Sequence, residues 1–259
     1  MHIKEFAQYF TTHHLLHEKI AQFIRNEPDE ILEPSVGRGD LLSAIHQYYT
    51  PKSVDSIHFD CYEIDSSIPF LNFLDNSLIH TFNYSLYHTD FLKANITKKY
   101  KTIIGNPPFI RTKNGNTSMF FVKKCIELLE PGGELIFVLP SDFFKLTSSE
   151  EAVTKLIQHG QITDIYHPNK ENLFTNASID VLIMRYCLDI NLPNRVQFNN
   201  VQKQVYNSEG VVTFVSIQSI EPSTTVFLGD LFEVYVGLVS GRESIFKQSF
   251  GNIYVLNDK

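Results

Sequence analysis

The sequence predicts an α/β fold, a doubly wound sheet of seven mostly parallel strands with an antiparallel last strand. β-rich runs alternate with helical patterns from about residue 15 to residue 186, and this alternation is typical of parallel sheets covered by helices. The last two β-rich runs, at 162–166 and 179–186, leave no room for a helix between them. Because a parallel connection usually needs a helix as its crossover, this pair is expected to include an antiparallel strand.

The first half of the chain alternates helix and strand in short units. Apolar residues recur at helical spacing in two segments, and β-rich runs follow each of them. The elements predicted here are a helix at about 15–25, a strand at 30–34, a turn at 35–39, a helix carrying Leu41, Leu42, Ile45 and Tyr49, and strands at 57–63 and near 85–88.

The second half begins with a strand at 100–104 that runs directly into Gly105. A helix at 118–129 is expected to end at residues 131–133, because glycine supplies a left-handed exit and proline cannot continue a helix. The uninterrupted apolar run at 134–139 predicts a strand buried on both faces. A helix at 149–159 and the two final strands complete the sheet.

Composition limits the kind of protein this is. The chain has 259 residues, a net charge of −7, 43% hydrophobic and 20% charged residues, which is typical of a soluble globular protein. No apolar stretch approaches the ~18 residues of a membrane-spanning helix, and the N-terminus lacks the apolar core of a secretory signal. Cys61, Cys125 and Cys187 are too few and too far apart for a disulfide framework. We therefore expect a cytoplasmic protein with reduced thiols.

The predicted domain organisation follows from the length of the chain and from a change in its secondary-structure pattern. One large domain, alone or with a fragment of a second, is the expectation for this length. From about Asn191 the sequence consists of short β-like pieces. We predict a main domain at 1–190, a β-rich connecting segment at 191–227 and the start of a further, incomplete domain at 228–259. Such a ~30-residue segment is too short to bury a core of its own.

A glycine-containing turn follows the first predicted strand. Gly37 and Gly39 lie one residue apart after Glu33, and such a turn lets the backbone pass close to a ligand at the carboxyl edge of the sheet. The third glycine of a dinucleotide fingerprint would fall at position 42, which is Leu42, and no phosphate-loop lysine follows. A tight turn that needs glycine only for its backbone conformation is an equal alternative.

Glu63 ends the second strand and strengthens the ligand interpretation. A carboxylate at that place in a nucleotide-binding sheet accepts the hydroxyl groups of a ribose. Its alternative is a solvated acid at a strand end. Together with the glycine turn, Glu63 indicates a site for a nucleoside without a pyrophosphate.

The strongest signal is Asn106-Pro107-Pro108-Phe109, directly after a buried strand. Consecutive prolines fix the backbone and make a rigid loop at the carboxyl edge of the sheet. The Asn106 side-chain carbonyl and the Pro107 backbone carbonyl would then offer two fixed acceptors to one planar NH₂ group. Phe109 offers a face for stacking.

Other residue patterns give weaker evidence for a functional site. His13 and His17 are spaced to share a helix face but lack a third ligand, so no metal site is predicted. Glu150 and Glu151 are explained as a helix N-terminal pair. The lysines at 98, 99, 101, 123 and 124 could meet phosphate or be solvated, and both interpretations remain open.

These motifs together carry a resemblance to a known family. The chain resembles the amino-methylating DNA methyltransferases of restriction-modification systems, specifically the adenine-N6 enzymes whose catalytic domain precedes the target-recognition domain. Their fold is the Rossmann-like methyltransferase sheet, and the tetrapeptide resembles their NPPY/F motif. The matching motifs are Phe10-Thr11-Thr12, Glu33 to Gly39, Glu63-Ile64, Asp90-Phe91, Asn106 to Phe109, Asn172 to Thr175 and Leu228 to Val234.

The resemblance implies S-adenosylmethionine as the cofactor of a catalytic domain at 1–190. It implies that Glu63 holds the ribose and that Asp90 and Phe91 hold the cofactor's adenine. The start of a target-recognition domain is implied at 228–259. The implied cofactor-binding residues are Phe10, Thr11, Thr12, Glu33, Gly37, Gly39, Glu63, Ile64, Asp90, Phe91 and Asn106.

The implied activity is methyl transfer to the exocyclic N6 of adenine in DNA. Asn106, Pro107 and Phe109 are the implied catalytic residues, and Phe109 and Phe174 the implied stacking pair for a base flipped out of the duplex. Double-stranded DNA and a cognate restriction endonuclease are the implied partners. A second polypeptide for target recognition is expected, because the chain looks like a truncated product or one part of a larger enzyme.

Two alternatives stay open at this stage. A protein glutamine-N5 methyltransferase would present the same planar amide to the same tetrapeptide, although those enzymes precede the sheet with a helical domain. A non-catalytic subunit that binds DNA or a second chain is the other alternative, and the intact tetrapeptide argues against it.

Overall fold

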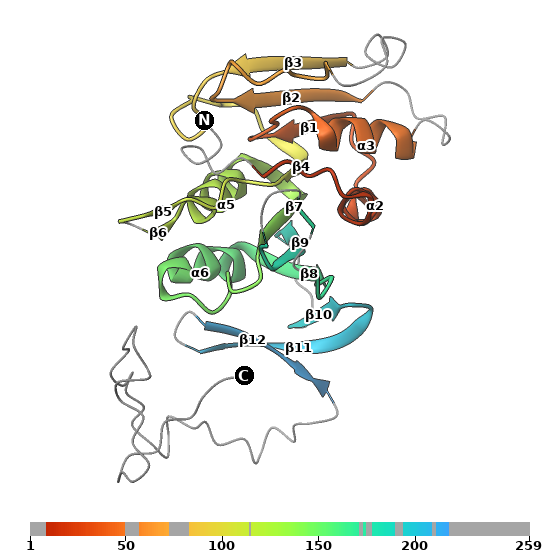
Figure 1. The fold of residues 1–259 in the computed structure, drawn as a ribbon. Coiled ribbons are helices and arrows are strands. Elements are labelled where there is room, and N and C mark those ends of the chain that lie inside the picture. Colours follow the sequence, from red (N-terminus) through yellow and green to blue (C-terminus); the bar gives the residue numbers. More distant parts are fainter. Residues whose placement is uncertain are drawn as a thin grey trace, which may run out of the picture. The chain divides into compact units, whose positions relative to one another are not determined.

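The computed structural model describes residues 9–49, 57–72, 83–113, 115–170, 173–174, 178–189, 194–208 and 211–217 (Figure 1). The chain divides into two compact units, residues 1–219 and 220–259. The second unit lies outside the described residues, and so does the segment 228–259 in which a recognition domain was expected to start. Among the described residues, no helix combines the length and the apolar composition that a membrane span requires.

A single large sheet organises the first unit (Figure 1). Its ten strands lie in the order β12-β11-β10-β8-β9-β7-β4-β1-β2-β3, and β5 and β6 form a separate hairpin. The strands are β1 Glu30–Glu33, β2 His58–Glu63, β3 Asn83–His88, β4 Tyr100–Gly105, β5 Arg111–Thr112, β6 Gly115–Asn116, β7 Leu129–Pro140, β8 Gly160–Tyr166, β9 Val181–Leu188, β10 Arg195–Phe198, β11 Val201–Ser208 and β12 Val211–Ser216. The helices are α2 His14–Phe23, α3 Asp40–Tyr49, α5 Thr117–Leu128, the 3₁₀ turn η2 Thr147–Ser149 and α6 Glu150–His159.

All seven strands predicted from the sequence are present. Strands β3, β2, β1, β4 and β7 pair in parallel, whereas β9 lies between β7 and β8 and is antiparallel to both. The expected antiparallel strand is therefore confirmed. With helices on both sides, this part of the sheet has the predicted doubly wound architecture.

Three further strands make the sheet larger than the predicted seven. β10 pairs in parallel with β8, and β11 and β12 follow as antiparallel neighbours. The buried side chains of Val196 and Val212 join the same apolar core as β7 and β9. The sheet thus continues past residue 190, where the sequence suggested a boundary, because these short β-like pieces complete an open edge.

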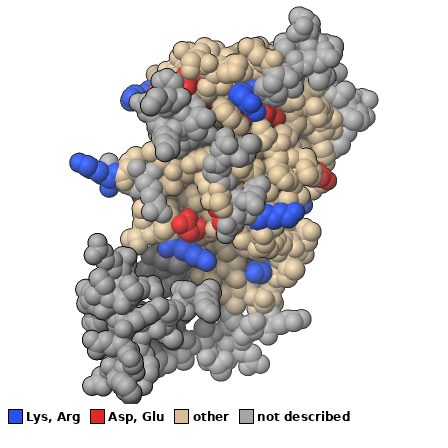
Figure 2. All heavy atoms as spheres, in the orientation of Figure 1, with Lys and Arg blue, Asp and Glu red and all other residues tan. Residues whose placement is uncertain are grey.

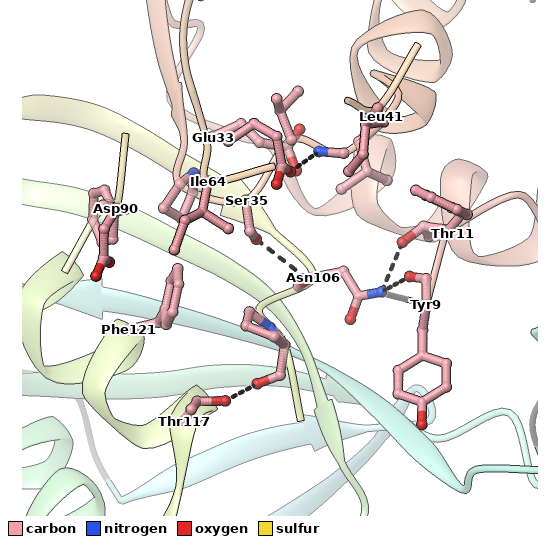
Figure 3. A pocket seen from close by; sticks show the side chains of 18 of the residues that line it. Tyr9, Thr11, Glu33, Ser35, Leu41, Ile64, Asp90, Asn106, Thr117 and Phe121 are labelled. Carbon is pink, nitrogen blue, oxygen red and sulfur yellow. Dashed lines mark hydrogen bonds between the residues drawn. The ribbon is translucent and has the colours of Figure 1, made fainter. Parts of the chain in front are cut away.

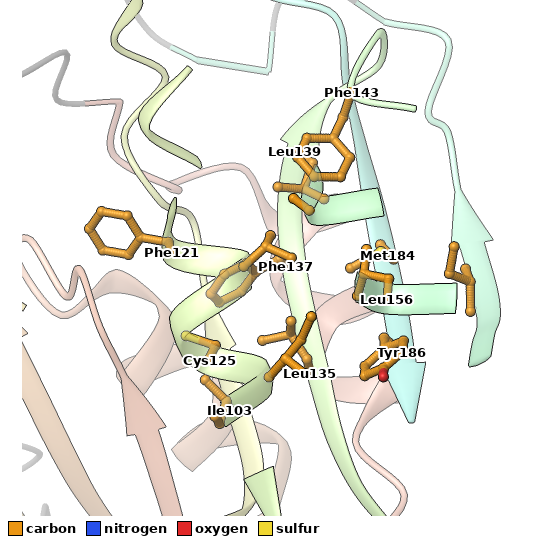
Figure 4. Packing of buried hydrophobic residues seen from close by; sticks show 14 of the residues in the cluster. Ile103, Phe121, Cys125, Leu135, Phe137, Leu139, Phe143, Leu156, Met184 and Tyr186 are labelled. Atoms are coloured by element: carbon orange, nitrogen blue, oxygen red, sulfur yellow. The ribbon is translucent and has the colours of Figure 1, made fainter. Parts of the chain in front are cut away.

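Two apolar cores lie on the two faces of the sheet. Successive residues of β7 alternate between them: Leu135 and Phe137 belong to the core with α5 and α6, and Ile136 and Val138 to the core with α2 and α3. This alternation is the period of a strand. Figure 4 shows the first core, where Cys125 of α5 and Leu156 of α6 face the sheet. All three cysteines are buried and unpaired.

The end of α5 differs from the prediction. The helix ends at Leu128, and the residue after it, Leu129, already has extended backbone angles (φ −74°, ψ 146°). Gly132 does adopt the left-handed region (φ +76°), but three residues further on, within an irregularity of the β4–β7 pairing. Pairing of Leu129 with Tyr100 ends the helix before the glycine is reached.

A buried ion pair joins β7 to β9. Glu134 is fully buried and accepts hydrogen bonds from Arg185 Nε at 2.9 Å and from Thr102 Oγ1 at 3.1 Å. Arg185 Nη2 lies 2.7 Å from the same carboxylate. The backbone N–H groups of Arg25 and Asn26 donate to it at 3.0 and 3.1 Å. Glu134 therefore also fixes the segment that follows α2.

Candidate active site

A cavity of about 250 Å³ opens at the carboxyl ends of β1, β2, β3 and β4 (Figure 3). Because these strands are parallel, the residues that follow each of them meet at one edge of the sheet. The sequence-predicted residues that line this cavity are Phe10, Thr11, Glu33, Gly37, Glu63, Ile64, Asp90, Phe91 and Asn106. Residues from five separate motifs are thus brought together by the fold.

The glycine turn between β1 and α3 needs glycine for two reasons. Gly37 and Gly39 both have positive φ values, +56° and +88°, where a side chain is strained. A Cβ atom on Gly39 would also lie 2.4 Å from Leu71 Cδ2, and one on Gly37 would lie 3.3 Å from the Phe10 ring. The close approach at Gly39 is therefore made by Leu71, and Gly39 is not among the residues lining the cavity.

Three carboxyl groups stand on the β1–β2 side of the cavity. Glu33 is 1% exposed, and its Oε2 atom has no hydrogen-bond partner among the described residues. Burial, with the nearby Asp40 and Glu63 carboxylates, holds the pKa of Glu33 well above its usual value. A ligand with hydrogen-bond donors would give Glu33 Oε2 a partner, and a ligand with positive charge would reduce the repulsion among the three carboxylates.

Glu63 is oriented by the backbone around it. Gly37 N–H donates to Glu63 Oε2 and Asp65 N–H donates to Oε1, both at 2.9 Å. Burial raises the pKa of Glu63, and these backbone hydrogen bonds oppose that effect. Each carboxylate oxygen keeps acceptor capacity, so Glu63 can receive two hydroxyl groups at once.

Apolar side chains line the β3 side of the cavity. The rings of Phe91 and Phe121 stack at 5.3 Å between centroids, and the Ile64 side chain is 53% exposed. Asp90 adds a carboxylate whose Oδ1 accepts from the Leu92 N–H at 3.0 Å. An apolar wall with one acidic acceptor beside it suits a planar heterocycle that carries an amino group.

Asn106, directly after β4, has a fixed amide. Its Nδ2 donates to the Tyr9 carbonyl at 2.9 Å and to Thr11 Oγ1 at 3.0 Å, as Figure 3 shows. Asn106 Oδ1 is buried and has no partner among the described residues. The two hydrogen bonds from Nδ2 fix the orientation of the amide. In this orientation Oδ1 is an acceptor that has no donor among the described residues.

The loop after Asn106 is held by the start of α5. Thr117 Oγ1 donates to the Pro108 carbonyl and accepts from the Ile110 N–H at 3.1 Å. Pro107 is buried and is not among the lining residues, whereas Pro108 lines the cavity. The Thr117 hydroxyl thus holds both sides of the loop that the sequence predicts to be rigid.

Phe109 and Phe174, the two predicted stacking rings, both pack against the ring of Tyr9. Phe109 stacks on Tyr9 with centroids 6.2 Å apart and 28° between planes. Phe174, which is buried, lies 5.9 Å from the same Tyr9 ring at 56°. Phe109 also lines a second cavity of about 580 Å³ beside Asp142 and Asp180. Sequence reasoning missed Tyr9, although it is the aromatic neighbour of Phe10.

Several other sequence candidates have local roles. Thr12 is exposed and is not among the lining residues. His13 caps α2 by accepting from the Leu15 N–H, and no group of three His, Cys, Asp or Glu that could hold a metal ion occurs within the part of the chain that the structure describes. The Glu150–Glu151 pair stands in the first turn of α6, as predicted.

The lysines left open by the sequence contact protein groups. Lys98 Nζ lies 2.7 Å from Asp60 Oδ2 and 2.8 Å from Glu30 Oε1, and Lys123 pairs with Glu151. On the face drawn in Figure 2, lysines and arginines of the described residues stand singly, some beside acidic residues. That face shows no continuous basic surface among the described residues.

Comparison with known proteins agrees with this geometry. The sequence pattern of the Eco57I restriction-modification methylase family matches residues 58–174, from β2 through the Asn106–Phe109 loop to Phe174. Over these residues the chain is similar to the Eco57I restriction-modification methylases.

Individual relatives show how much of a protein this chain represents. It is 30% identical over 228 residues to the Type II methyltransferase M.HincII of Haemophilus influenzae, covering 79% of this chain and 42% of that protein. It is 27% identical to the ribosomal RNA small subunit methyltransferase A of Mycoplasma mobile, covering 80% and 85%. The chain therefore spans less than half the length of M.HincII.

Solved structures share the fold. The M protein of the type I restriction enzyme EcoKI matches with a TM-score of 0.59 at 18% identity, covering 70% of this chain and 44% of that one. A protein of Listeria monocytogenes described as a class I S-adenosylmethionine-dependent methyltransferase matches with a TM-score of 0.58 at 18% identity, covering 71% and 61%. The sheet is thus that of the Rossmann-like methyltransferases.

Proposed function

We propose that this domain transfers a methyl group from S-adenosylmethionine to the N6 nitrogen of adenine in double-stranded DNA, as the modification part of a restriction-modification system. The observation that carries the proposal is Asn106, whose buried Oδ1 lacks a donor while both of its amide hydrogens are held by the segment at 9–11. An exocyclic amino group supplies the donor that this atom lacks.

The cavity fits the proposed cofactor. S-adenosylmethionine, when bound, supplies a methyl group on a positively charged sulfur that is an excellent leaving group. The unpartnered Oε2 of Glu33 and the raised pKa of its carboxyl group suit a cationic ligand. Glu63 would accept the ribose hydroxyls, and Asp90 would accept the adenine amino group beside the Phe91–Phe121 pair. Ile64 would cover the open face of the ring.

The chemistry required of the chain is orientation and charge stabilisation. An adenine N6 lone pair is delocalised into the ring and is a poor nucleophile. Asn106 Oδ1 and the Pro107 carbonyl would accept one hydrogen bond each from the amino group, which favours a tetrahedral nitrogen and stabilises the positive charge that develops there. The nitrogen forms its bond to the methyl carbon as the carbon–sulfur bond breaks, and the extra proton leaves to solvent.

Access to the target atom requires a flipped base, because N6 is inaccessible within a duplex. Phe109 and Phe174 are the proposed stacking partners. Both rings contact Tyr9, so an aromatic ring already occupies the space beside each of them. A cognate restriction endonuclease and a second polypeptide for target recognition are the further proposed partners.

The test is transfer of a labelled methyl group by the 259-residue chain. Three substrates are compared: plasmid DNA, a ribosomal RNA hairpin and a glutamine-containing peptide, and the methylated product is identified after hydrolysis. We expect N6-methyladenine in DNA, and Asn106→Ala should lower turnover by roughly 10²–10³ while cofactor affinity stays within a few-fold. Label in the RNA or the peptide, but not in DNA, would contradict the proposed substrate.

A further inference from the structure

Helix α5 joins the two ends of the candidate active site. Its first residue, Thr117, holds the Asn106–Phe109 loop through the Pro108 carbonyl and the Ile110 N–H. One turn further on, Phe121 lines the cavity and stacks on Phe91. The same helix therefore contacts both the catalytic loop and the loop that follows β3.

Lys124, on the same helix, binds the loop after β3 through its ammonium group. Lys124 Nζ donates to the backbone carbonyls of Phe91, Leu92 and Ala94, the last two at 3.3 and 2.6 Å. It also lies 4.8 Å from the centroid of the Phe91 ring. An ammonium group has three N–H donors, so these three carbonyls use all of them.

This arrangement holds a turn that begins with Asp90. The N–H groups of Lys93 and Ala94 both donate to the Asp90 carbonyl at 3.0 Å, and the Asp90 carboxylate accepts from the Leu92 N–H. The Phe91 carbonyl also accepts from the Ala94 N–H within the turn, at 3.2 Å, so Lys124 adds a donor from outside the turn to this carbonyl and to those of Leu92 and Ala94. Burial lowers the pKa of Lys124, and the nearby Asp90 and Glu127 carboxylates oppose that effect. The hydrogen bonds of its ammonium group go to backbone oxygens.

We infer that Lys124 is a positioning residue that sets the Asp90 carboxylate against the amino group of the cofactor's adenine, and so determines the base specificity of the cofactor site. The inference rests on the proposed function, because it takes the ligand of Asp90 to be an adenine ring. Without the ammonium, the Leu92 and Ala94 carbonyls lose its hydrogen bonds and the Phe91 carbonyl keeps only the Ala94 N–H, so the turn is free to shift. Asp90 would then no longer stand beside the Phe91–Phe121 pair.

The neighbouring lysine provides a matched control. Lys123 lies on the same helix with the same side chain, but it pairs with Glu151 of α6 and is not among the residues lining the cavity. Lys124→Met and Lys123→Met remove the same group from positions one residue apart. Lys124→Arg keeps a cation and several donors, and tests whether the charge and its hydrogen bonds restore the effect.

The experiment measures cofactor-base preference by calorimetry. The probes are S-adenosylhomocysteine and its inosine counterpart, in which an oxygen replaces the amino group that Asp90 would bind. The wild-type chain should prefer the adenosine compound by about tenfold or more, as expected when a hydrogen bond to a carboxylate is lost. Lys124→Met should reduce the preference to within about threefold, Lys123→Met should retain it, and Lys124→Arg should restore it in part.

The outcomes are separable. If the wild-type chain binds neither compound, the proposed function itself fails. If it binds both equally, or if Lys124→Met weakens both equally and keeps the preference, Lys124 has only a structural role and the inference is overturned. Should Lys124→Met fail to fold, Lys124→Gln takes its place. A preference that is reduced in Lys124→Gln and at least partly kept in Lys124→Arg supports positioning, and an unchanged preference in Lys124→Gln overturns it.

Discussion

Thr11→Val tests whether the orientation of the Asn106 amide limits the reaction. Thr11 is 4% exposed, and its hydroxyl accepts one of the two Asn106 amide hydrogens at 3.0 Å. Valine has nearly the same shape as threonine but offers no acceptor. The substitution therefore leaves the packing of the segment intact and removes one of the two contacts that keep Oδ1 turned toward its proposed substrate.

The size of the effect follows from the remaining contact. A buried N–H without a partner costs about 1–3 kcal/mol, and the Tyr9 carbonyl still holds the other amide hydrogen. We expect the lower part of that range, about 1–2 kcal/mol. At 1.36 kcal/mol for each factor of ten, this corresponds to a loss of roughly 5- to 30-fold in the rate of methyl transfer.

The assay is single-turnover methyl transfer to DNA with labelled cofactor, beside calorimetry of cofactor binding. Thr11→Ser keeps the hydroxyl and should stay close to wild type. In an Asn106→Ala background, Thr11→Val should cause no further loss, since the amide that it orients is gone. Wild-type turnover in Thr11→Val would refute the reasoning, and a loss confined to cofactor affinity would show instead that Thr11 acts on the cofactor.

Three further predictions concern the acidic groups. Glu63→Ala should weaken S-adenosylhomocysteine binding by about 1.5–3 kcal/mol, since a charged acceptor is lost; calorimetry showing an unchanged affinity would exclude the ribose role. Glu33→Gln should raise the melting temperature of the ligand-free protein at pH 7–8 and much less at pH 4. The raised pKa of Glu33 stabilises the folded state below the usual carboxyl pKa, and this stabilisation is lost as the pH rises toward the raised value. A melting-temperature difference that is independent of pH would count against this role of Glu33. Glu134→Gln should destabilise the fold by about 3–5 kcal/mol in urea, as expected when a buried arginine loses its partner; a change below ~1 kcal/mol would show that Arg185 finds another.

The alternation of strands and helices, and the chemistry at the strand ends, were readable from the sequence. Hydrophobic periodicity is a local property, so β1, β2 and β4 and their neighbours could be predicted, and with them the edge at which their end residues meet. Glu63 and Asn106 could be predicted from the sequence for the same reason. Glu63 ends a strand and Asn106 directly follows one, and the parallel sheet brings both residues to one cavity.

The tertiary structure alone decided the contacts that orient these groups. Asn106 is held by Tyr9 and Thr11, 97 and 95 residues away in sequence, and Lys124 binds carbonyls 30 to 33 residues away. No local pattern encodes such pairs, because they depend on how helices and loops pack on the finished sheet. The addition of β10 to the edge at β8 is of the same kind: a strand's sequence indicates that it pairs, but the open edge of the sheet determines its partner.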